Sequence, residues 1–322
     1  MTRWIERWNA YWFPKTTTVY LGASRIIAVA AQLFFFRTSL SDQIHLLDKN
    51  PTFIYPQVLI RAIAAIVPRD VVFTPSGFTV IYWVTMIAGV AALIGLFTRA
   101  SLLIFALGTW FFVAHLYSYA DIHHPEAVFC IFLLALAFAP SGDSLSVDAL
   151  IRRARAGRHV PEAPREADTA MWPLKLAHVL MALTYFSTGL TKMVFGGLDW
   201  MNGYTLQGYL LADGLRRNLP LGLWVAQHHT LCVLLSIFTV ALELSFFISL
   251  FVPRTAPFFL LNALLFQVGL LLTAGHRFYP HMMVLFLLLL FIEPQWWRAP
   301  LTKYFGVHLP RWRGQEQAQQ PL

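Results

Sequence analysis

The chain has 322 residues, of which 57% are hydrophobic and only 12% are charged, whereas soluble domains carry about 25% charged residues. Apolar runs of about 18 to 20 residues recur, which is the length that spans the hydrocarbon core of a bilayer. The composition excludes an ordinary soluble domain, and it predicts an all-α, polytopic membrane protein. We expect the net charge of +8 to lie in basic loops on the cytoplasmic side, not to bind nucleic acid.

The N-terminal segment MTRWIERWNAYWFPK interleaves charges with tryptophans. A cleavable signal peptide would instead have a short apolar core before small residues. At helical spacing Trp4, Trp8 and Trp12 fall on one side. The segment is therefore predicted to be a helix that lies on the membrane surface.

Eight candidate transmembrane helices follow from the apolar runs, and the fourth and the eighth of them are short. They cover residues 18–36, 77–97, 101–119, 125–140, 171–195, 230–252, 256–274 and 279–293. The connections 37–76 and 196–229 each hold an apolar stretch too short to span, which we expect to lie at the interface or to re-enter the membrane. Residues 141–170 are predicted to be a soluble loop. The domain prediction is a transmembrane domain over 1–297 and a short basic tail over 298–322.

Orientation follows from the lysines and arginines of the loops. The side that holds both termini carries 14 of them and the opposite side carries 7. The positive-inside rule then places both termini in the cytoplasm. With this topology His123, His124 and Lys192 come to the outer face of the membrane, although they are far apart in the sequence. We therefore expect any chemistry at the outer face.

A polar stripe runs along the fifth predicted span. His178, Tyr185, Thr188 and Lys192 follow one another at spacings of seven, three and four residues, which puts them on one side of a helix. Polar groups at membrane depth must face protein or a water-filled cavity. Small neighbours such as Gly189 allow another helix to approach closely. The alternative is that Lys192 is an anchor whose ammonium reaches the outer headgroups.

Two further charges lie within spans. Arg25 is in the first span and Glu243 is in the sixth, at similar depths from the same membrane side. An unpaired charge at mid-helix costs about 2.5–3.5 kcal/mol on insertion scales. We predict that the two form a structural ion pair, and the alternative is that each finds its own partners.

His123 and His124 open the fourth span in the sequence DIHHPE. They are either polar residues of the interface, or one of them is an acid–base group or a quinone ligand. A metal site is not expected, because adjacent histidines point in different directions and no HExxH spacing occurs. Cys130 and Cys232 lie in apolar runs, which is typical of buried small hydrophobic residues.

The stretch YFSTGLTKMVFGGLDWMNGYTL, Tyr185 to Leu206, resembles the pattern YFxAGxxKxxxxWxxGY of the vitamin K-dependent gamma-glutamyl carboxylases. This chain has two or three extra residues before the tryptophan. GLFTRAS, ADIHHPEAVFCIFLLAL and SLSVDAL resemble further family segments, and Arg25 matches an arginine of the first span. Together they cover about residues 18 to 297. The related bacterial group is the horizontally transferred transmembrane domain family.

The resemblance implies an enzyme that acts on a reduced vitamin K-type quinone, menaquinol-like, with O2 and CO2 as co-substrates. Lys192 would be the base that deprotonates the quinol, and His124 would be its neighbour. His123, Tyr185, Trp200, Gly203 and Tyr204 would contact the quinone. A lysine can act as a base when burial lowers its pKa. The implied partners are membrane lipid, an isoprenoid quinone and a peptide or protein substrate on the outer face.

Two departures from the family limit what is implied. Animal carboxylases continue into a large extramembrane part, whereas 25 residues follow position 297 here, and Gln267 stands where the family has a histidine. We therefore expect the quinol half-reaction more firmly than carboxylation, in the cytoplasmic (inner) membrane of a bacterium. The alternatives are a non-catalytic quinone-binding or assembly protein on the same scaffold, and a small-molecule transporter, for which no matching pair of broken helices is evident.

Overall fold

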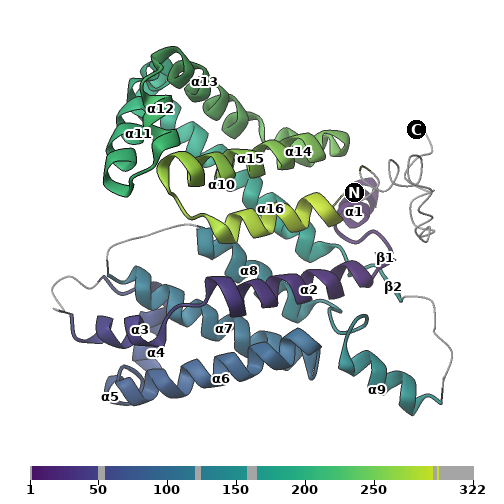
Figure 1. The fold of residues 1–322 in the computed structure, drawn as a ribbon. Helices are drawn as coiled ribbons and strands as arrows, with labels where there is room; N and C mark the ends of the chain where they lie inside the picture. Colours follow the sequence, from purple (N-terminus) through teal and green to yellow (C-terminus); the bar gives the residue numbers. More distant parts are fainter. Residues whose placement is uncertain (1, 50–54, 120–124, 158–164, 293–295, 297–322) are drawn as a thin grey trace. The chain divides into compact units, whose positions relative to one another are not determined.

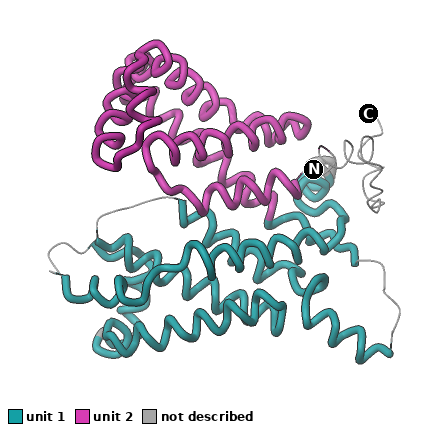
Figure 2. Tube along the Cα trace, viewed as in Figure 1, with its two compact units in different colours: residues 1–173, 310–322 teal, residues 174–309 magenta. Residues whose placement is uncertain are grey.

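The computed structural model describes residues 2–49, 55–119, 125–157, 165–292 and 296. The chain divides into two compact units, Met1–Pro173 with Pro310–Leu322, and Leu174–Leu309 (Figures 1 and 2). The two units are described separately below. The predicted domain boundary after residue 297 falls outside the described residues and stays a prediction.

In its described residues, the first unit is built from helices with one short pair of strands. Its elements are α1 (Thr2–Trp12), β1 (Thr16–Thr17), α2 (Val19–Ala31), the π-helix η1 (Gln32–Phe36), α3 (Leu40–Leu47), α4 (Val58–Ile66), α5 (Arg69–Val72), α6 (Pro75–Ile94), α7 (Thr98–Tyr117), α8 (Pro125–Phe138), α9 (Val147–Arg155) and β2 (Glu166–Ala167). β1 and β2 pair antiparallel, with Thr16 opposite Ala167. Helices α6, α7 and α8 pack in sequence order, and α2 packs on α6 and α8.

The second unit is entirely helical in its described residues. Its elements are α10 (Trp172–Gly196), the 3₁₀ helix η3 (Gly197–Asn202), α11 (Tyr204–Arg217), α12 (Pro220–Ala226), α13 (His229–Ser245), α14 (Ile248–Phe251), the 3₁₀ turn η4 (Pro253–Thr255), α15 (Ala256–Ala274) and α16 (Tyr279–Phe291). Helices α11 and α12 pack on each other and on α13 and α15, and α15 packs on α16.

Local sequence explains where the long helices begin and end. The Thr74 hydroxyl accepts a hydrogen bond from the Gly77 N–H at 3.0 Å, and Pro75 occupies the first turn of α6, where its missing N–H costs nothing. α6 ends at Gly95, whose φ of 73° is the left-handed conformation that glycine adopts most readily. α15 ends in the same way at Gly275, with φ 70°.

The span predictions agree well with these helices. Among the described residues, six helical segments are long and apolar enough to cross a membrane: Val19–Phe36, Pro75–Ile94, Thr98–Tyr117, Trp172–Asn202, His229–Phe251 and Pro253–Ala274. Pro125–Phe138 and Tyr279–Phe291 are shorter apolar helices, as expected for the fourth and eighth spans. The predicted all-α polytopic membrane fold is confirmed.

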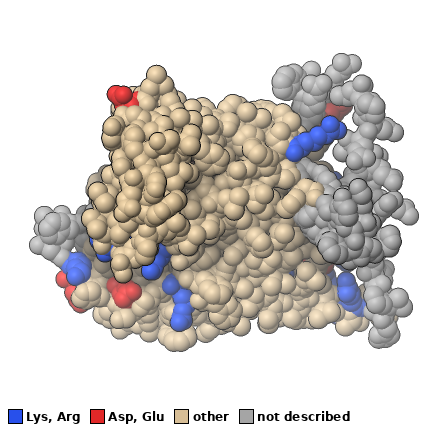
Figure 3. Space-filling model, turned by 45° about the horizontal axis from the view of Figure 1, so that its top comes forward, with Lys and Arg blue, Asp and Glu red and all other residues tan. Residues whose placement is uncertain are grey.

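The connections hold more structure than the sequence predicts. Residues 141–170, expected to be a soluble loop, contain helix α9 and strand β2. α9 begins at Ser146, whose hydroxyl accepts a hydrogen bond from the Ala149 N–H. This N-cap serine starts a helix within a segment whose polar composition predicts a loop. The N-terminal segment forms helix α1, as predicted. On the face drawn in Figure 3, most of the described surface carries no charged side chain.

Candidate functional site

The polar stripe of α10 faces other helices of its own unit, as predicted. His178 Nε2 lies 2.9 Å from Ser249 Oγ, and the ring of Tyr185 stacks on Phe246 with 4.8 Å between centroids. Gly189 lies so close to α13 that an added Cβ would come within 2.9 Å of the Glu243 Cβ. A small residue at this position therefore lets the two helices approach at the level of the charged groups.

Lys192 and Glu243 form an ion pair in which one ammonium group bonds both carboxylate oxygens. Lys192 Nζ donates to Oε1 at 2.8 Å and to Oε2 at 2.7 Å. The side chain of Lys192 is 22% exposed and that of Glu243 is 6% exposed. Thr188, one turn before Lys192, also lies within hydrogen-bonding reach of the Glu243 carboxylate. Two opposite charges removed from water in this way stabilise each other only because the geometry is bidentate.

The ion pair joins Lys192 to a residue within the neighbouring candidate span. Glu243 lies 14 residues after His229 and 8 residues before Phe251, the ends of that candidate span. The segment that contains Lys192 continues for 10 more residues, to Asn202. An anchoring lysine would extend towards the headgroup region instead. The geometry therefore favours a built intramembrane site over an anchor.

Trp200, one of the predicted quinone contacts, lies beside this ion pair. Lys192 Nζ is 5.1 Å from the centroid of the Trp200 ring, within the range of a cation–π interaction. Gly203 packs on the backbone of Val233, and the Tyr204 ring lies against the His229 ring at a tilt of 31°, with 4.3 Å between centroids. Gly203 and Tyr204 thus fix the junction between η3 and α11, while Trp200 contacts the charged group itself.

A second part of the stripe is centred on Tyr185. Gln267 Nε2 donates to the Tyr185 hydroxyl at 3.0 Å, and this hydroxyl lies 3.4 Å from the carbonyl of Ala263. The amide oxygen Oε1 of Gln267 is buried and has no hydrogen-bond partner. A buried acceptor of this kind normally finds a donor, so a hydroxyl-bearing ligand would satisfy it.

Arg25 and Glu243 do not follow the predicted pairing. Glu243 is taken by Lys192, whereas the buried guanidinium of Arg25 donates to the carbonyl of Ser141 at 2.7 Å and to the carbonyl of Leu145. Each charge has partners within its own unit, so the alternative of separate partners describes the structure. The predicted Arg25–Glu243 pair rests on the similar distances of the two residues from the ends of their helices. These distances carry no information about the loop whose carbonyl groups bind Arg25.

Sequence reasoning missed two partners in these networks. From the sequence, Glu243 is predicted to pair with Arg25, and Gln267 only departs from a family histidine. Gly189, at one turn from Lys192, is the sequence signal that α13 comes close there.

The predicted site residues His123 and His124 lie outside the described residues. Within the described residues, no three His, Cys, Asp or Glu side chains gather closely enough to hold a metal ion. Cys130 and Cys232 are free and buried.

Residues 63–296 match the HTTM domain, the transmembrane domain associated with vitamin K-dependent carboxylases. The match covers more than half of the chain, and the chain belongs to the HTTM domain family. It is an integral membrane protein of that family. No curated protein and no solved structure matches the chain.

Proposed function

We propose that the protein is a membrane enzyme that removes a proton from a quinol, with Lys192 as the base. The observation that carries the proposal is the bidentate Lys192–Glu243 ion pair with the Trp200 ring over the ammonium group. Ionisable groups within spans are rare and mark functional sites by default. Membership of the HTTM domain family supports the same chemistry.

The ion pair supplies a base in two steps. First, the ammonium of Lys192 transfers a proton to Glu243, so that one N–H bond breaks and one carboxyl O–H bond forms, leaving a neutral amine beside a neutral acid. An apolar ligand that excludes water favours this transfer, because both charges vanish. Second, the lone pair of the Lys192 nitrogen accepts the proton of a bound hydroxyl group, and the ammonium is restored.

The residues around the ion pair fit a quinone head group. The Trp200 ring offers an aromatic face, and the unpartnered Gln267 oxygen offers an acceptor for a hydroxyl group. A reduced vitamin K-type quinone, menaquinol-like, would supply the acidic hydroxyl. Its oxygenation by O2 would generate the strong base that removes a proton from the acceptor before CO2 adds. The proposed setting is the cytoplasmic membrane with both termini inside, and the proposed acceptor is a peptide or protein at the outer face.

The test is quinol-dependent turnover by the purified protein. The wild type should form quinone epoxide and, with an acceptor, fix CO2, and Lys192→Ala should abolish both. Lys192→Arg is the matched control, because arginine keeps the positive charge beside Glu243 yet cannot lose its proton. It should retain the fold but not the activity. Full activity of Lys192→Arg, or a wild type that never oxidises a quinol, would overturn the proposal.

A non-catalytic quinone-binding or assembly protein is the second candidate. It is favoured by the closed geometry of the ion pair, since both carboxylate oxygens already hold the ammonium group. Lipid extraction and mass spectrometry of the purified protein should then find an isoprenoid quinone without turnover. Absence of quinone from the wild type would argue against both candidates.

A further inference from the structure

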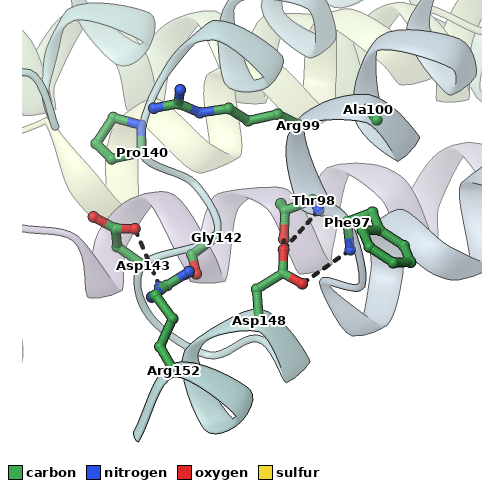
Figure 4. A pocket seen from close by; sticks show the side chains of 9 residues that line it. All are labelled: Phe97, Thr98, Arg99, Ala100, Pro140, Gly142, Asp143, Asp148 and Arg152. Atoms are coloured by element: carbon green, nitrogen blue, oxygen red, sulfur yellow. Dashed lines mark hydrogen bonds and ion pairs between the residues drawn. The ribbon is translucent and has the colours of Figure 1, made fainter. Parts of the chain in front are cut away.

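A pocket lies in the first unit, and its lining shares no residue with the Lys192–Glu243 network. It has a volume of about 400 Å³ and is lined by Phe97, Thr98, Arg99, Ala100, Pro140, Gly142, Asp143, Asp148 and Arg152 (Figure 4). The start of α7, the segment that follows α8 and the start of α9 form its walls. α7 and α8 are apolar helices, so these walls lie where apolar helices end, at the level expected for lipid headgroups.

The two carboxylates that line the pocket accept hydrogen bonds from other protein groups. Asp148 accepts hydrogen bonds from the Phe97 N–H at 2.9 Å and from both the N–H and the hydroxyl of Thr98 at 2.7 Å. Asp143 accepts from Arg152 Nη2 at 3.2 Å. The Asp143 charge is thus paired with Arg152, and the Asp148 carboxylate is turned towards the N–H groups that begin α7.

The cations of the pocket still have free donors. Arg152 makes both of its contacts, to Gly142 and Asp143, through Nη2, which leaves its other guanidinium nitrogens available. Arg99 is exposed and has no hydrogen-bonding or ionic partner among the described residues. Guanidinium groups bind phosphate with paired, charge-assisted hydrogen bonds. The chemistry available in the pocket therefore suits a phosphate group.

Large apolar side chains in the same segments as these cations are exposed, and one of them, Phe97, lines the pocket. Phe97 is 74% exposed and Leu150 is 61% exposed, and Leu145 is also exposed. Phe97 and Leu145 have positive φ angles of 46° and 52°, a conformation that is unfavourable for side chains of this size. The hydrogen bond from Phe97 to Asp148 and that from Arg25 to the Leu145 carbonyl hold both backbones in place. Such strain is maintained chiefly at functional positions.

We propose that this pocket binds the headgroup of an anionic phospholipid. The phosphate lies against Arg99 and Arg152, and the acyl chains run along the apolar rim of Phe97, Leu145 and Leu150. Arg155 lies in the last turn of α9 and is not among the residues that line the pocket. An apolar rim distinguishes this occupant from free phosphate, which would gain nothing from Phe97 or Leu150. The proposal does not depend on the quinol chemistry of the second unit.

The test is native mass spectrometry of the full chain in an uncharged detergent with short-chain phosphatidylglycerol or phosphatidylcholine. The wild type should retain phosphatidylglycerol preferentially, and Arg99→Gln should weaken that retention about five- to tenfold, the effect of losing one cation near a lipid surface. Arg155→Gln is the control with the same charge change on the same face outside the pocket lining. It should leave retention within about twofold.

Three results would overturn the proposal. Equal retention of the two lipids would remove the preference for negative charge. An equal loss in Arg99→Gln and Arg155→Gln would show a diffuse basic surface without a site. Displacement of the lipid by inorganic phosphate at millimolar concentration would show a free-phosphate site. Melting temperatures of both variants, measured in the same detergent, establish that each is folded when its lipid binding is compared.

Discussion

Lys192 and Glu243, 51 residues apart in the sequence, form an ion pair between two apolar helices, with Lys192 Nζ 2.8 and 2.7 Å from the two carboxylate oxygens. An ammonium and a carboxylate at this depth would each be unfavourable alone. Their pairing explains how α10 accommodates a lysine, and it leaves the proton able to move between the two groups. The same geometry thus supports both the fold of the second unit and the proposed chemistry.

The first prediction concerns the stability that this ion pair provides. Lys192→Met should destabilise the protein by about 3–5 kcal/mol, because it leaves the Glu243 carboxylate buried without its partner. The double variant Lys192→Met with Glu243→Gln should recover much of that loss, since no unpaired charge remains. Chemical or thermal unfolding of the wild type, Lys192→Met, Glu243→Gln and the double variant in one detergent measures the coupling. Strictly additive losses would show that the two side chains do not interact.

The helices and their order could be predicted from the sequence because a span needs a long apolar run, and this requirement is local. The stripe of Tyr185 and Lys192 was predictable for the same reason, from spacing along one helix. The partners were not, because Glu243 and Gln267 lie on other helices and their approach depends on helix tilt and on small residues such as Gly189. The carbonyls that hold Arg25 come from a loop whose path has no periodic signal.

The second prediction is a pH dependence that arises from Asp148 in the first unit. Burial alone would raise the pKa of Asp148, but hydrogen bonds from Thr98 and Phe97 and the charge of Arg152 hold that pKa below its usual value. A carboxyl group with a lowered folded-state pKa stabilises the fold above its unfolded pKa of about 3.9, and this contribution is lost as the pH falls through the folded value.

The variant Asp148→Asn tests this dependence. Near neutral pH it should be less stable than the wild type by about 0.5–2 kcal/mol, the usual worth of a side chain that caps a helix start. The difference should shrink when melting is repeated at pH values below about 4, where the wild-type carboxyl becomes protonated. A stability difference between the wild type and Asp148→Asn that stays constant across this pH range would show that the ionised form of Asp148 is not the form that stabilises the start of α7.

The third prediction concerns the hydrogen bond between Tyr185 and Gln267. Tyr185→Phe removes the hydroxyl that accepts from Gln267 Nε2, so a buried amide loses its partner, at a cost of about 1–3 kcal/mol. Gln267→Leu removes both the donor and the unpartnered oxygen, so it should cost less than Tyr185→Phe. Unfolding measurements on the two variants compare these losses directly. A larger loss in Gln267→Leu would mean that the amide oxygen has a partner after all.

The fourth prediction uses two glycines of the same segment. Gly203 has a φ of 86°, and an added Cβ would lie 2.7 Å from the backbone nitrogen of Val233. Gly203→Ala should therefore destabilise the protein by more than 1 kcal/mol. Gly208, within α11, is the matched control, because its Cβ would meet nothing within 4 Å. Gly208→Ala should stabilise by about 0.5–1 kcal/mol through the better helix propensity of alanine.

The two glycine variants also separate stability from the site. Gly203 ends η3, the segment that carries Trp200 to its position over Lys192. Displacing this junction should move the Trp200 ring away from the ammonium group, so that Gly203→Ala weakens quinone retention while Gly208→Ala leaves it unchanged. Quinone content after purification, measured at a temperature where both variants are folded, provides the comparison. Equal quinone content in the two variants would show that the position of η3 does not matter for the ligand.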